Sequence, residues 1–333
     1  MSYHVTLIPG DGIGPEVVDA AVRVVDATGV SVEWERAEGG ADTFARTGVA
    51  LPEATINSVQ KNGVGLKGPT ATPSSCGFRS INVELRQRLD LYANFRPAQS
   101  VPGTVERFDD VDLLVIRENT EGLYSGLEHV VVPGVVESLR IITERASRRV
   151  VQFAFDVARR RGRRKVTAVH KANILKLSDG LFLKVAREVA EQHGDIAYDE
   201  CIVDACAMKL VTNPQQFDVL VMENLFGDII SDLCSGLVGG LGLTASGNIG
   251  EELAVFEAVH GTAPDIAGKG IANPTALIRS AALMLEHLGE LEAANRVETA
   301  IRKVIAAGEA TTGDLGGNAD TMAFTDAVIA SLK

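Results

Sequence analysis

The sequence has no hydrophobic run long enough to cross a membrane and no excess of positive charge. A membrane-spanning helix needs about 20 mostly apolar residues, and no segment approaches that length. Residues 1–4 lead directly into a strand-like pattern, so no signal peptide is expected. The net charge is −12, from 44 acidic and 32 basic residues, which argues against nucleic acid or an anionic membrane as a partner.

The four cysteines lack the spacing of a zinc or redox motif. Cys76, Cys201, Cys206 and Cys234 form no CxxC pair and have no histidine partners nearby. They are expected to be mostly small core residues of a reduced protein. We therefore predict a cytoplasmic location.

What the sequence does contain is an alternation of short apolar runs with helical patterns. Strands are expected at residues 4–8, 112–116, 166–169 and 217–222, and helices at residues 15–28, 138–161, 180–193 and 274–288. The alternation predicts an α/β architecture with a largely parallel sheet. At 333 residues and 46% hydrophobic, the chain is long enough for two domains or lobes.

A glycine-rich turn, Gly10-Asp-Gly-Ile-Gly14, lies between the first expected strand and helix. Glu33 or Glu35 stands about 20 residues further on, where a Rossmann fold carries its ribose-binding acid. However, the third glycine comes one residue too early for G-x-G-x-x-G, and Pro15 follows it. We reject the Rossmann interpretation and expect a tight strand-to-helix turn.

Two aspartates, Asp228 and Asp232, follow the expected strand at residues 217–222. If the chain is helical after Gly227, both carboxylates lie on one face with Cβ atoms about 5–6 Å apart. Mg²⁺ or Mn²⁺ would compensate their repulsion, because both cations prefer hard oxygen ligands. Asp204 also follows an apolar run and would supply a third carboxylate. Two solvated aspartates on a helix surface remain the alternative.

Three arginines, Arg86, Arg96 and Arg117, have the character of a carboxylate-binding group. Arginine binds a carboxylate through two parallel charge-assisted hydrogen bonds, which also fix its orientation. Taken singly, each is more often a surface residue. Arg117 is the exception, since it follows an expected strand and open α/β sheets bind ligands at the carboxyl ends of their strands.

Three further positions have both a functional and a structural interpretation. Tyr124 is either an acid or a partly buried tyrosine with a structural hydrogen bond. Lys171 follows an expected strand and is either a base or a charged loop residue. The loop at residues 259–274, which contains His260, either wraps a planar ligand or simply connects two elements.

With these residues in view, the chain resembles the metal-dependent β-decarboxylating dehydrogenases, which act on isocitrate, 3-isopropylmalate, homoisocitrate or tartrate. Seven ordered motifs carry the resemblance along the whole chain: Gly10-Asp-Gly-Ile-Gly-Pro-Glu16, Leu91-Tyr-Ala-Asn-Phe-Arg-Pro97, Arg117-Glu-Asn-Thr-Glu-Gly-Leu-Tyr124, His170-Lys-Ala-Asn173, Asn224-Leu-Phe-Gly-Asp-Ile-Ile-Ser-Asp232, Ser246-Gly-Asn-Ile-Gly250 and His260-Gly-Thr-Ala-Pro264.

The resemblance implies the isopropylmalate dehydrogenase-like fold, with two α/β lobes, a central cleft and a non-Rossmann cofactor site. Residues 1–94 and 247–333 would form the large, cofactor-binding lobe. Residues 95–246 would form the small lobe with the dimer interface and the metal and substrate residues. It also implies an obligate homodimer with shared active sites, in which Lys171 and Asp204 of one subunit meet Asp228 and Asp232 of the other.

Residue roles are implied in the same way. The catalytic residues would be Tyr124 and Lys171, and the metal ligands Asp204, Asp228 and Asp232. The substrate would contact Ser80, Asn82, Arg86, Arg96, Arg117, Tyr124, Lys171 and Asn173. The cofactor would contact Lys67, Thr72, His260, Gly261, Thr262, Ala263, Asp265, Ile266 and Asn273.

Two positions discriminate between substrates within the family. Ser80 and Asn82, in the segment at residues 77–86, offer hydrogen bonds to a carboxylate and match the pattern of isocitrate dehydrogenases. An isopropyl group would leave both side chains unpaired. Homoisocitrate, one methylene longer, is the second candidate, because one methylene is worth only about 1–3 kcal/mol of discrimination.

The cofactor prediction depends on Asp265 and Ile266. NADP-dependent members typically carry Lys-Tyr here to bind the 2′-phosphate, which Asp265 would repel. We therefore predict NAD, with Mg²⁺ or Mn²⁺. A catalytically silent regulatory subunit is the non-enzyme alternative, although the metal aspartates, the tyrosine and the lysine are all present.

Overall fold

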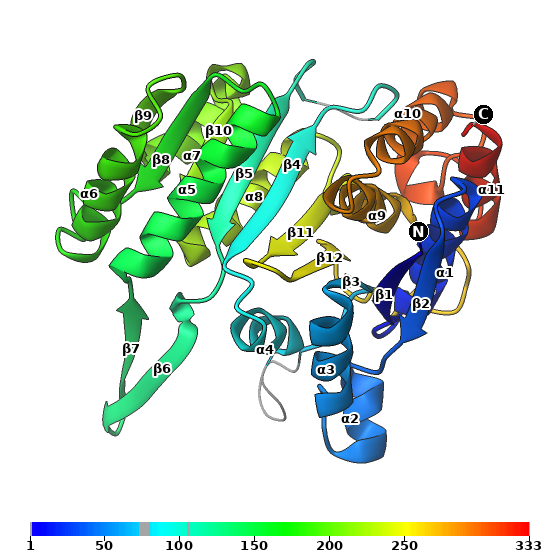
Figure 1. Ribbon diagram of the computed structural model, residues 1–333, viewed down its shortest axis with the longest axis horizontal. Coiled ribbons are helices and arrows are strands. Elements are labelled where there is room, and N and C mark those ends of the chain that lie inside the picture. The colour runs from blue at the N-terminus through cyan, green and yellow to red at the C-terminus, as the bar shows by residue number, and fades with distance from the viewer. Residues whose placement is uncertain (1, 73–79, 105–106, 333) are drawn as a thin grey trace.

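The structure, a computed structural model, describes residues 2–72, 80–104 and 107–332. Cys76 and residues 77–79 of the substrate-discriminating segment therefore lie outside the described residues. Within these ranges one mixed sheet crosses the molecule (Figure 1). Its strands, from one edge to the other, are β2 (Val32–Arg36), β1 (Tyr3–Ile8), β3 (Val64–Lys67), β12 (Ala254–Ala258), β11 (Ala245–Ile249), β4 (Ala93–Gln99), β5 (Asp112–Glu118), β10 (Val219–Met222), β8 (Lys165–His170) and β9 (Ala197–Ile202).

The sheet is parallel toward both edges and antiparallel in its centre. Strands β2, β1, β3 and β12 run parallel, as do β5, β10, β8 and β9. Strand β11 is antiparallel to β12 and β4, and β4 is antiparallel to β5. The expected boundaries at residues 94/95 and 246/247 fall inside β4 and β11, which pair with each other. The division into lobes stays a prediction.

Helices cover both faces of this sheet. On the near face in Figure 1, α5 and α6 lie over one half and α9 over the other, while α8 lies behind β5. The helices are α1 (Gly14–Ala27), α2 (Ala41–Thr47), α3 (Glu53–Asn62), α4 (Ile81–Arg88), α5 (Glu144–Arg160), α6 (Ser178–Ala190), α7 (Val203–Thr212), α8 (Asn224–Leu237), α9 (Thr275–His287), α10 (Leu291–Ala307) and α11 (Thr321–Ala330). None of the described helices is both long and apolar enough to span a membrane.

The glycine-rich turn before α1 packs against the protein's own backbone. Gly10 and Gly12 have positive φ angles of 76° and 61°. A Cβ at either position would overlap a carbonyl oxygen, that of Pro69 or that of Thr262 respectively. The buried Asp11 side chain ties the turn down by accepting three backbone N–H bonds. These glycines therefore serve a tight turn, which agrees with rejecting the Rossmann interpretation.

The helix predicted from residue 138 begins six residues later than expected. Its first residues belong instead to β7 (Val135–Ile141), which pairs with β6 (Gly122–Val132) as an antiparallel hairpin. The Thr143 hydroxyl accepts the Ala146 N–H at 3.1 Å and so caps α5 where the strand has ended. The hairpin projects from the body (Figure 1) and exposes apolar side chains along both strands, among them Leu127, Val130, Val136 and Leu139.

Candidate active site

Helix α8 carries the aspartate pair, as predicted from its spacing. Glu223 caps the helix by accepting the N–H groups of Leu225 and Phe226 at 3.1 and 2.8 Å. Gly227 is required for packing, because a Cβ there would overlap the Arg117 side chain. Asp228 and Asp232 then follow at one-turn spacing on the same helix.

Arginines and a tyrosine compensate the two carboxylates. Arg117 Nη1 donates to one oxygen of Asp228, and the Tyr124 hydroxyl donates to the other. Arg96 Nη1 lies 3.0 Å from Asp232 Oδ1, and Arg96 Nη2 lies 3.8 Å from Asp228 Oδ1. Both aspartates are thus paired with buried arginine side chains and are not simply solvated on the helix surface.

The two carboxylates differ electrostatically. Burial alone would raise the pKa of Asp228, but Arg117, the Tyr124 hydroxyl and Arg96 hold that pKa below its ordinary value. Burial raises the pKa of Asp232, and Arg96 offsets this only in part. Burial, followed by repulsion from Arg86 and Arg96, lowers the pKa of Arg117 to about 10, so it remains a cation at neutral pH.

The three predicted arginines converge on one cavity of about 240 Å³. Arg86 comes from α4, Arg96 from β4 and Arg117 from β5. Ser80, Asn82, Tyr124 and Asp228 also line the cavity. The structure therefore brings together six of the eight predicted substrate residues and leaves out Lys171 and Asn173.

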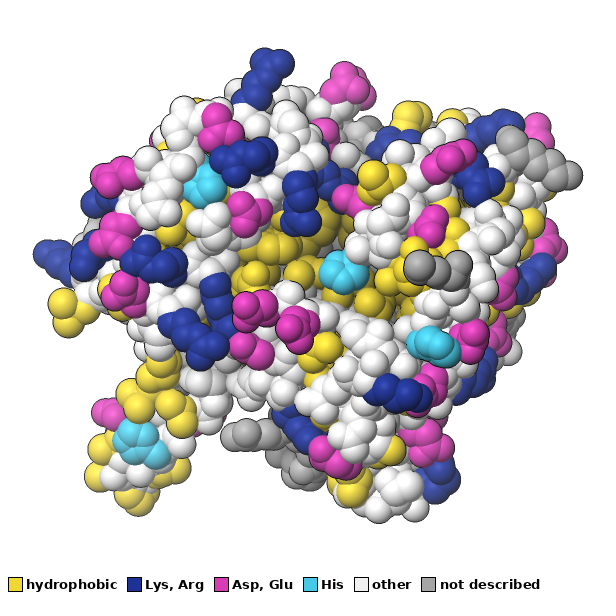
Figure 2. All heavy atoms as spheres, in the orientation of Figure 1, with side chains coloured by type: hydrophobic (Ala, Val, Ile, Leu, Met, Phe, Trp, Pro, Cys, Tyr) yellow, Lys and Arg dark blue, Asp and Glu magenta, His cyan; other side chains and the backbone are white. Residues whose placement is uncertain are grey.

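Strand alternation places this polar cavity on one face of the sheet. Successive residues of a strand point to opposite faces. Phe95 and Phe256, next to Arg96 and Glu257, line a separate cavity of about 320 Å³ between α5 and α9. Figure 2 shows that face, with a hollow floored by hydrophobic side chains. The charged neighbours Arg96 and Glu257 line the polar cavity behind the same strands.

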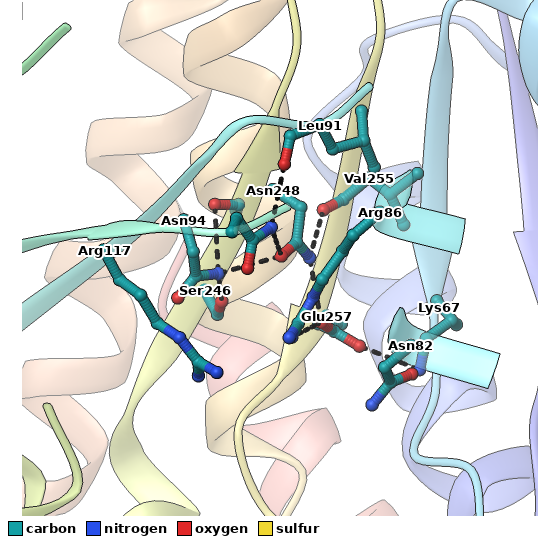
Figure 3. A network of polar contacts seen from close by, with 12 residues as sticks. Lys67, Asn82, Arg86, Leu91, Asn94, Arg117, Ser246, Asn248, Val255 and Glu257 are labelled. Atoms are coloured by element: carbon teal, nitrogen blue, oxygen red, sulfur yellow. Dashed lines mark hydrogen bonds and ion pairs between the residues drawn. The ribbon is translucent and has the colours of Figure 1, made fainter. Parts of the chain in front are cut away.

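Glu257, on β12, is a site residue that the sequence interpretation missed. Figure 3 shows Arg86 from α4 and Lys67 from β3 converging on its carboxylate. The ion pairs measure 3.0 and 2.8 Å, and Asn248 donates to the same carboxylate at 2.8 Å. Burial opposes ionisation, but Lys67 and Arg86 keep the pKa of Glu257 far below its usual range. The available signal was an acidic residue within the apolar segment at residues 254–258, because a charge there needs a partner.

Lys171 and Asp204 lie at the carboxyl ends of β8 and β9, and they contact each other. Lys171 Nζ is 2.9 Å from Asp204 Oδ1, and this hydrogen bond lowers the pKa of Asp204. The Asp204 side chain is 68% exposed. No group of three His, Cys, Asp or Glu residues able to hold a metal occurs in the described part of this one chain. Asp204 therefore does not join Asp228 and Asp232 within a single chain.

A third cavity, of about 750 Å³, adjoins the polar cavity and shares lining residues with it. Of the predicted cofactor residues it is lined by His260, Gly261, Ala263, Ile266 and Asn273, and the first two also line the polar cavity. The Nε2 atom of His260 is buried without a hydrogen-bond partner among the described residues, which leaves it available to a ligand. Burial lowers the pKa of His260, so the ring is neutral at physiological pH.

The other predicted cofactor residues are placed differently. Lys67 lines the polar cavity, Thr262 faces the glycine-rich turn through its carbonyl, and Thr72 and Asp265 are exposed. Asp314 is an additional lining residue, and it accepts a hydrogen bond from Asn273 Nδ2 at 2.9 Å. No local pattern marked Asp314, because its role arises from contact with a segment 41 residues away.

Comparison with known proteins accounts for this arrangement. Residues 4–328 match the family model for isocitrate/isopropylmalate dehydrogenase. The chain is 57% identical to a mitochondrial NAD isocitrate dehydrogenase catalytic subunit 5 from Arabidopsis thaliana, covering 97% of this chain and 87% of the relative. It is also 57% identical to the chloroplastic 3-isopropylmalate dehydrogenase of Solanum tuberosum, covering 91% and 85%. The crystal structure of isocitrate dehydrogenase from Methylococcus capsulatus has a TM-score of 0.96 and 54% identity, covering 99% of both chains.

These relatives confirm the expected fold, a non-Rossmann α/β architecture of the isopropylmalate dehydrogenase type. The organelles in the two plant names belong to those proteins, so the cytoplasmic location of this chain stays a prediction. With a family match over nearly its whole length and an almost identical solved fold, the chain belongs to the isocitrate/isopropylmalate dehydrogenase family.

Proposed function

We propose that this protein catalyses the NAD-dependent oxidative decarboxylation of isocitrate to 2-oxoglutarate and CO₂, with Mg²⁺ or Mn²⁺ as the metal. The observation that carries the proposal is the cavity in which Arg86, Arg96 and Arg117 converge beside Asp228. Three arginines in an otherwise acidic protein match the several carboxylates of a tricarboxylate substrate.

The carboxylate pair on α8 fits a magnesium-type site that is completed from outside the chain. Mg²⁺ is usually held by one or two carboxylates together with substrate oxygens and water. Asp228 and Asp232 are each partly exposed, so oxygens remain accessible. When bound, the metal would act as a Lewis acid toward the substrate hydroxyl and the carbonyl derived from it.

The protein's own groups would bind the substrate and move its protons. Arg86, Arg96 and Arg117 would orient the substrate carboxylates in the polar cavity, which adjoins the cavity lined by predicted cofactor residues. Lys171 of the partner subunit accepts the hydroxyl proton, directly or through water. Burial and the hydrogen bond to Asp228 raise the pKa of Tyr124, which keeps its phenol protonated. Tyr124 is thus suited to deliver a proton to the carbon that has lost CO₂.

Ser80 and Asn82 favour isocitrate over 3-isopropylmalate as the substrate. Both line the polar cavity, and Asn82 Oδ1 is 3.2 Å from the Thr70 hydroxyl. An isopropyl group there would leave polar atoms unpaired, whereas a carboxylate would accept hydrogen bonds from them. Because relatives of equal identity are named for both reactions, this local chemistry carries the substrate assignment.

An initial-rate panel tests the function directly. Isocitrate, homoisocitrate, 3-isopropylmalate and malate are each assayed with NAD and NADP, with and without EDTA. We expect turnover of isocitrate with NAD that EDTA abolishes. Preference for homoisocitrate would favour the second substrate candidate, and activity that survives EDTA would refute the metal-dependent reaction. No turnover by the isolated chain would instead support a catalytically silent regulatory subunit.

Cofactor choice is tested at Asp265 and Ile266, of which Ile266 lines the cavity of about 750 Å³. In Asp265→Lys/Ile266→Tyr, we expect the ratio of kcat/KM for NADP to that for NAD to rise about 10- to 100-fold, since a charge-assisted hydrogen bond is worth about 1.5–3 kcal/mol. Asp265→Asn is the matched control, because it removes the repulsion without adding a cation. An unchanged ratio in the double variant would refute the assignment of NAD preference to this pair.

We further propose that the active site is shared between two copies of the chain. Lys171 is partly buried and Asp204 is exposed. Exposed apolar side chains follow each of them closely in the sequence, Ile174 and Leu177 after Lys171 and Met208 after Asp204. The exposed apolar hairpin offers a second contact region. The Arabidopsis relative is named a subunit. The alternative is therefore that the partner in the shared site is a different chain rather than a second copy of this one.

A further inference from the structure

Arg140 links the projecting hairpin to two elements of the active site. It lies at the end of β7, yet its side chain is only 14% exposed. Arg140 Nη2 is 2.7 Å from Asp179 Oδ1, and Nε is 3.5 Å from Glu223 Oε2. Its guanidinium also lies over the Phe226 ring, 5.0 Å from the centroid. One cation therefore joins two buried carboxylates whose side chains are 2% and 5% exposed.

Each of these carboxylates holds the backbone of an element that carries functional residues. Asp179, in the first turn of α6, accepts the backbone N–H of Lys171 at 2.5 Å. Glu223 caps α8 through the N–H groups of Leu225 and Phe226. Asp179 thus fixes the loop of Lys171, and Glu223 fixes the start of the helix that bears the aspartate pair.

Without the arginine, the two carboxylates would be uncompensated. Burial raises the pKa of Glu223, Arg140 opposes that rise, and the charge of Asp179 adds to it. Breaking a buried ion pair by removing one partner leaves a buried charge, so one carboxyl must take up a proton or move toward water. Either change weakens the hydrogen bonds that this carboxyl group accepts from backbone N–H groups.

We propose that Arg140 is a positioning residue, which sets the spacing between the Lys171 loop and helix α8 from its place on the hairpin. This inference rests on the proposed function, in which Lys171 serves the partner subunit's site and the α8 aspartates serve the chain's own. Arg140 then positions the Lys171 loop, which serves the partner subunit's active site, and helix α8, which serves the chain's own active site.

The test compares Arg140→Gln with a matched control, Arg163→Gln. Arg163 is 15% exposed and also bridges two carboxylates, Asp112 at 2.5 Å and Asp218 at 3.2 Å. These carboxylates lie at the amino ends of β5 and β10, away from the cavity, and neither belongs to the predicted site residues. Hydrogen exchange of the Lys171, Leu225 and Phe226 amides is measured by mass spectrometry or NMR. We expect faster exchange at these amides in Arg140→Gln only, and a kcat about 100-fold lower with an unchanged KM for NAD. The control should keep kcat within about twofold of wild type.

Arg140→Lys provides the conservative variant, because its ammonium keeps the charge but reaches one carboxylate at a time. We expect exchange rates and kcat between those of wild type and Arg140→Gln, and it replaces the latter should that variant not fold. Equal exchange at the three amides in the Arg140 and Arg163 variants would overturn the positioning role. A wild-type protein that turns over no substrate would refute the proposed function alone, because the exchange measurement still decides the role of Arg140.

Discussion

Mixed dimers of Lys171→Met and Asp232→Asn subunits should be active although each variant alone is not. Loss of a general base lowers kcat by about 10²–10⁴-fold, and loss of a metal ligand should be at least as severe. If Lys171 acts in the partner's site, a mixed dimer contains one intact site and one that carries both defects. Differently tagged subunits are co-expressed, purified through both tags and assayed for isocitrate oxidation. We expect about half of the wild-type rate per dimer.

The outcome depends on where Lys171 and Asp204 act. In the structure they contact each other and do not join the α8 aspartates within one chain. If the site were complete within a single chain, every subunit of the mixed dimer would carry a defect and no rate would be recovered. Mixed dimers of wild type with the doubly substituted chain are the control, because they should contain no intact site. A monomeric variant that retains activity would also contradict the shared site.

Replacing Glu257 by Gln should cost about 3–5 kcal/mol of unfolding free energy, the usual cost of breaking a buried ion pair from one side. The variant leaves Lys67 and Arg86 buried without the carboxylate that both contact. Urea denaturation at pH 7 measures the loss. Glu53→Gln is the control, since Glu53 pairs with Arg88 at the surface and should change stability by no more than about 1 kcal/mol.

The cost of the Glu257 substitution should depend on pH in a defined direction. Because its folded-state pKa is depressed, Glu257 contributes stability fully above its unfolded pKa, near 4.3. That contribution is lost as the pH falls below this value toward the folded-state pKa. The difference between wild type and Glu257→Gln should therefore be constant from pH 7 to 5 and shrink under acid conditions. A difference that grows with acidification would contradict the ion-paired state of Glu257.

Local sequence patterns predicted part of the secondary structure and a few of the site residues, whereas most residue roles came from the family resemblance. The one-turn spacing of Asp228 and Asp232 and the placement of Arg117 at a strand end follow from periodicity alone. The predicted start of the helix at residue 138 was wrong. The pairing of β7 with β6 and the cap at Thr143 outweighed the helical pattern of the sequence there.

What could not be predicted depends on contacts between distant segments. Glu257 acquires its partners only when β12 pairs with β3 and α4 packs beside them, which brings together residues more than 170 positions apart. Asp314 reaches Asn273 in the same way. The antiparallel pairing in the centre of the sheet was likewise not predicted, because strand direction is set by long-range pairing rather than by local composition.

The central position of β11 and β12 has a consequence for how the chain is made. Strand β11 pairs with β4, and β12 pairs with β3; these partners are synthesised about 150 and about 190 residues earlier, respectively. Until the later strands emerge from the ribosome, β3 and β4 each present an edge with unpaired backbone groups. Open edges invite pairing with other chains, and slow long-range closure prolongs the exposure. A nascent chain of this protein is thus most vulnerable to aggregation late in its synthesis, just before the strands that join the sheet become available.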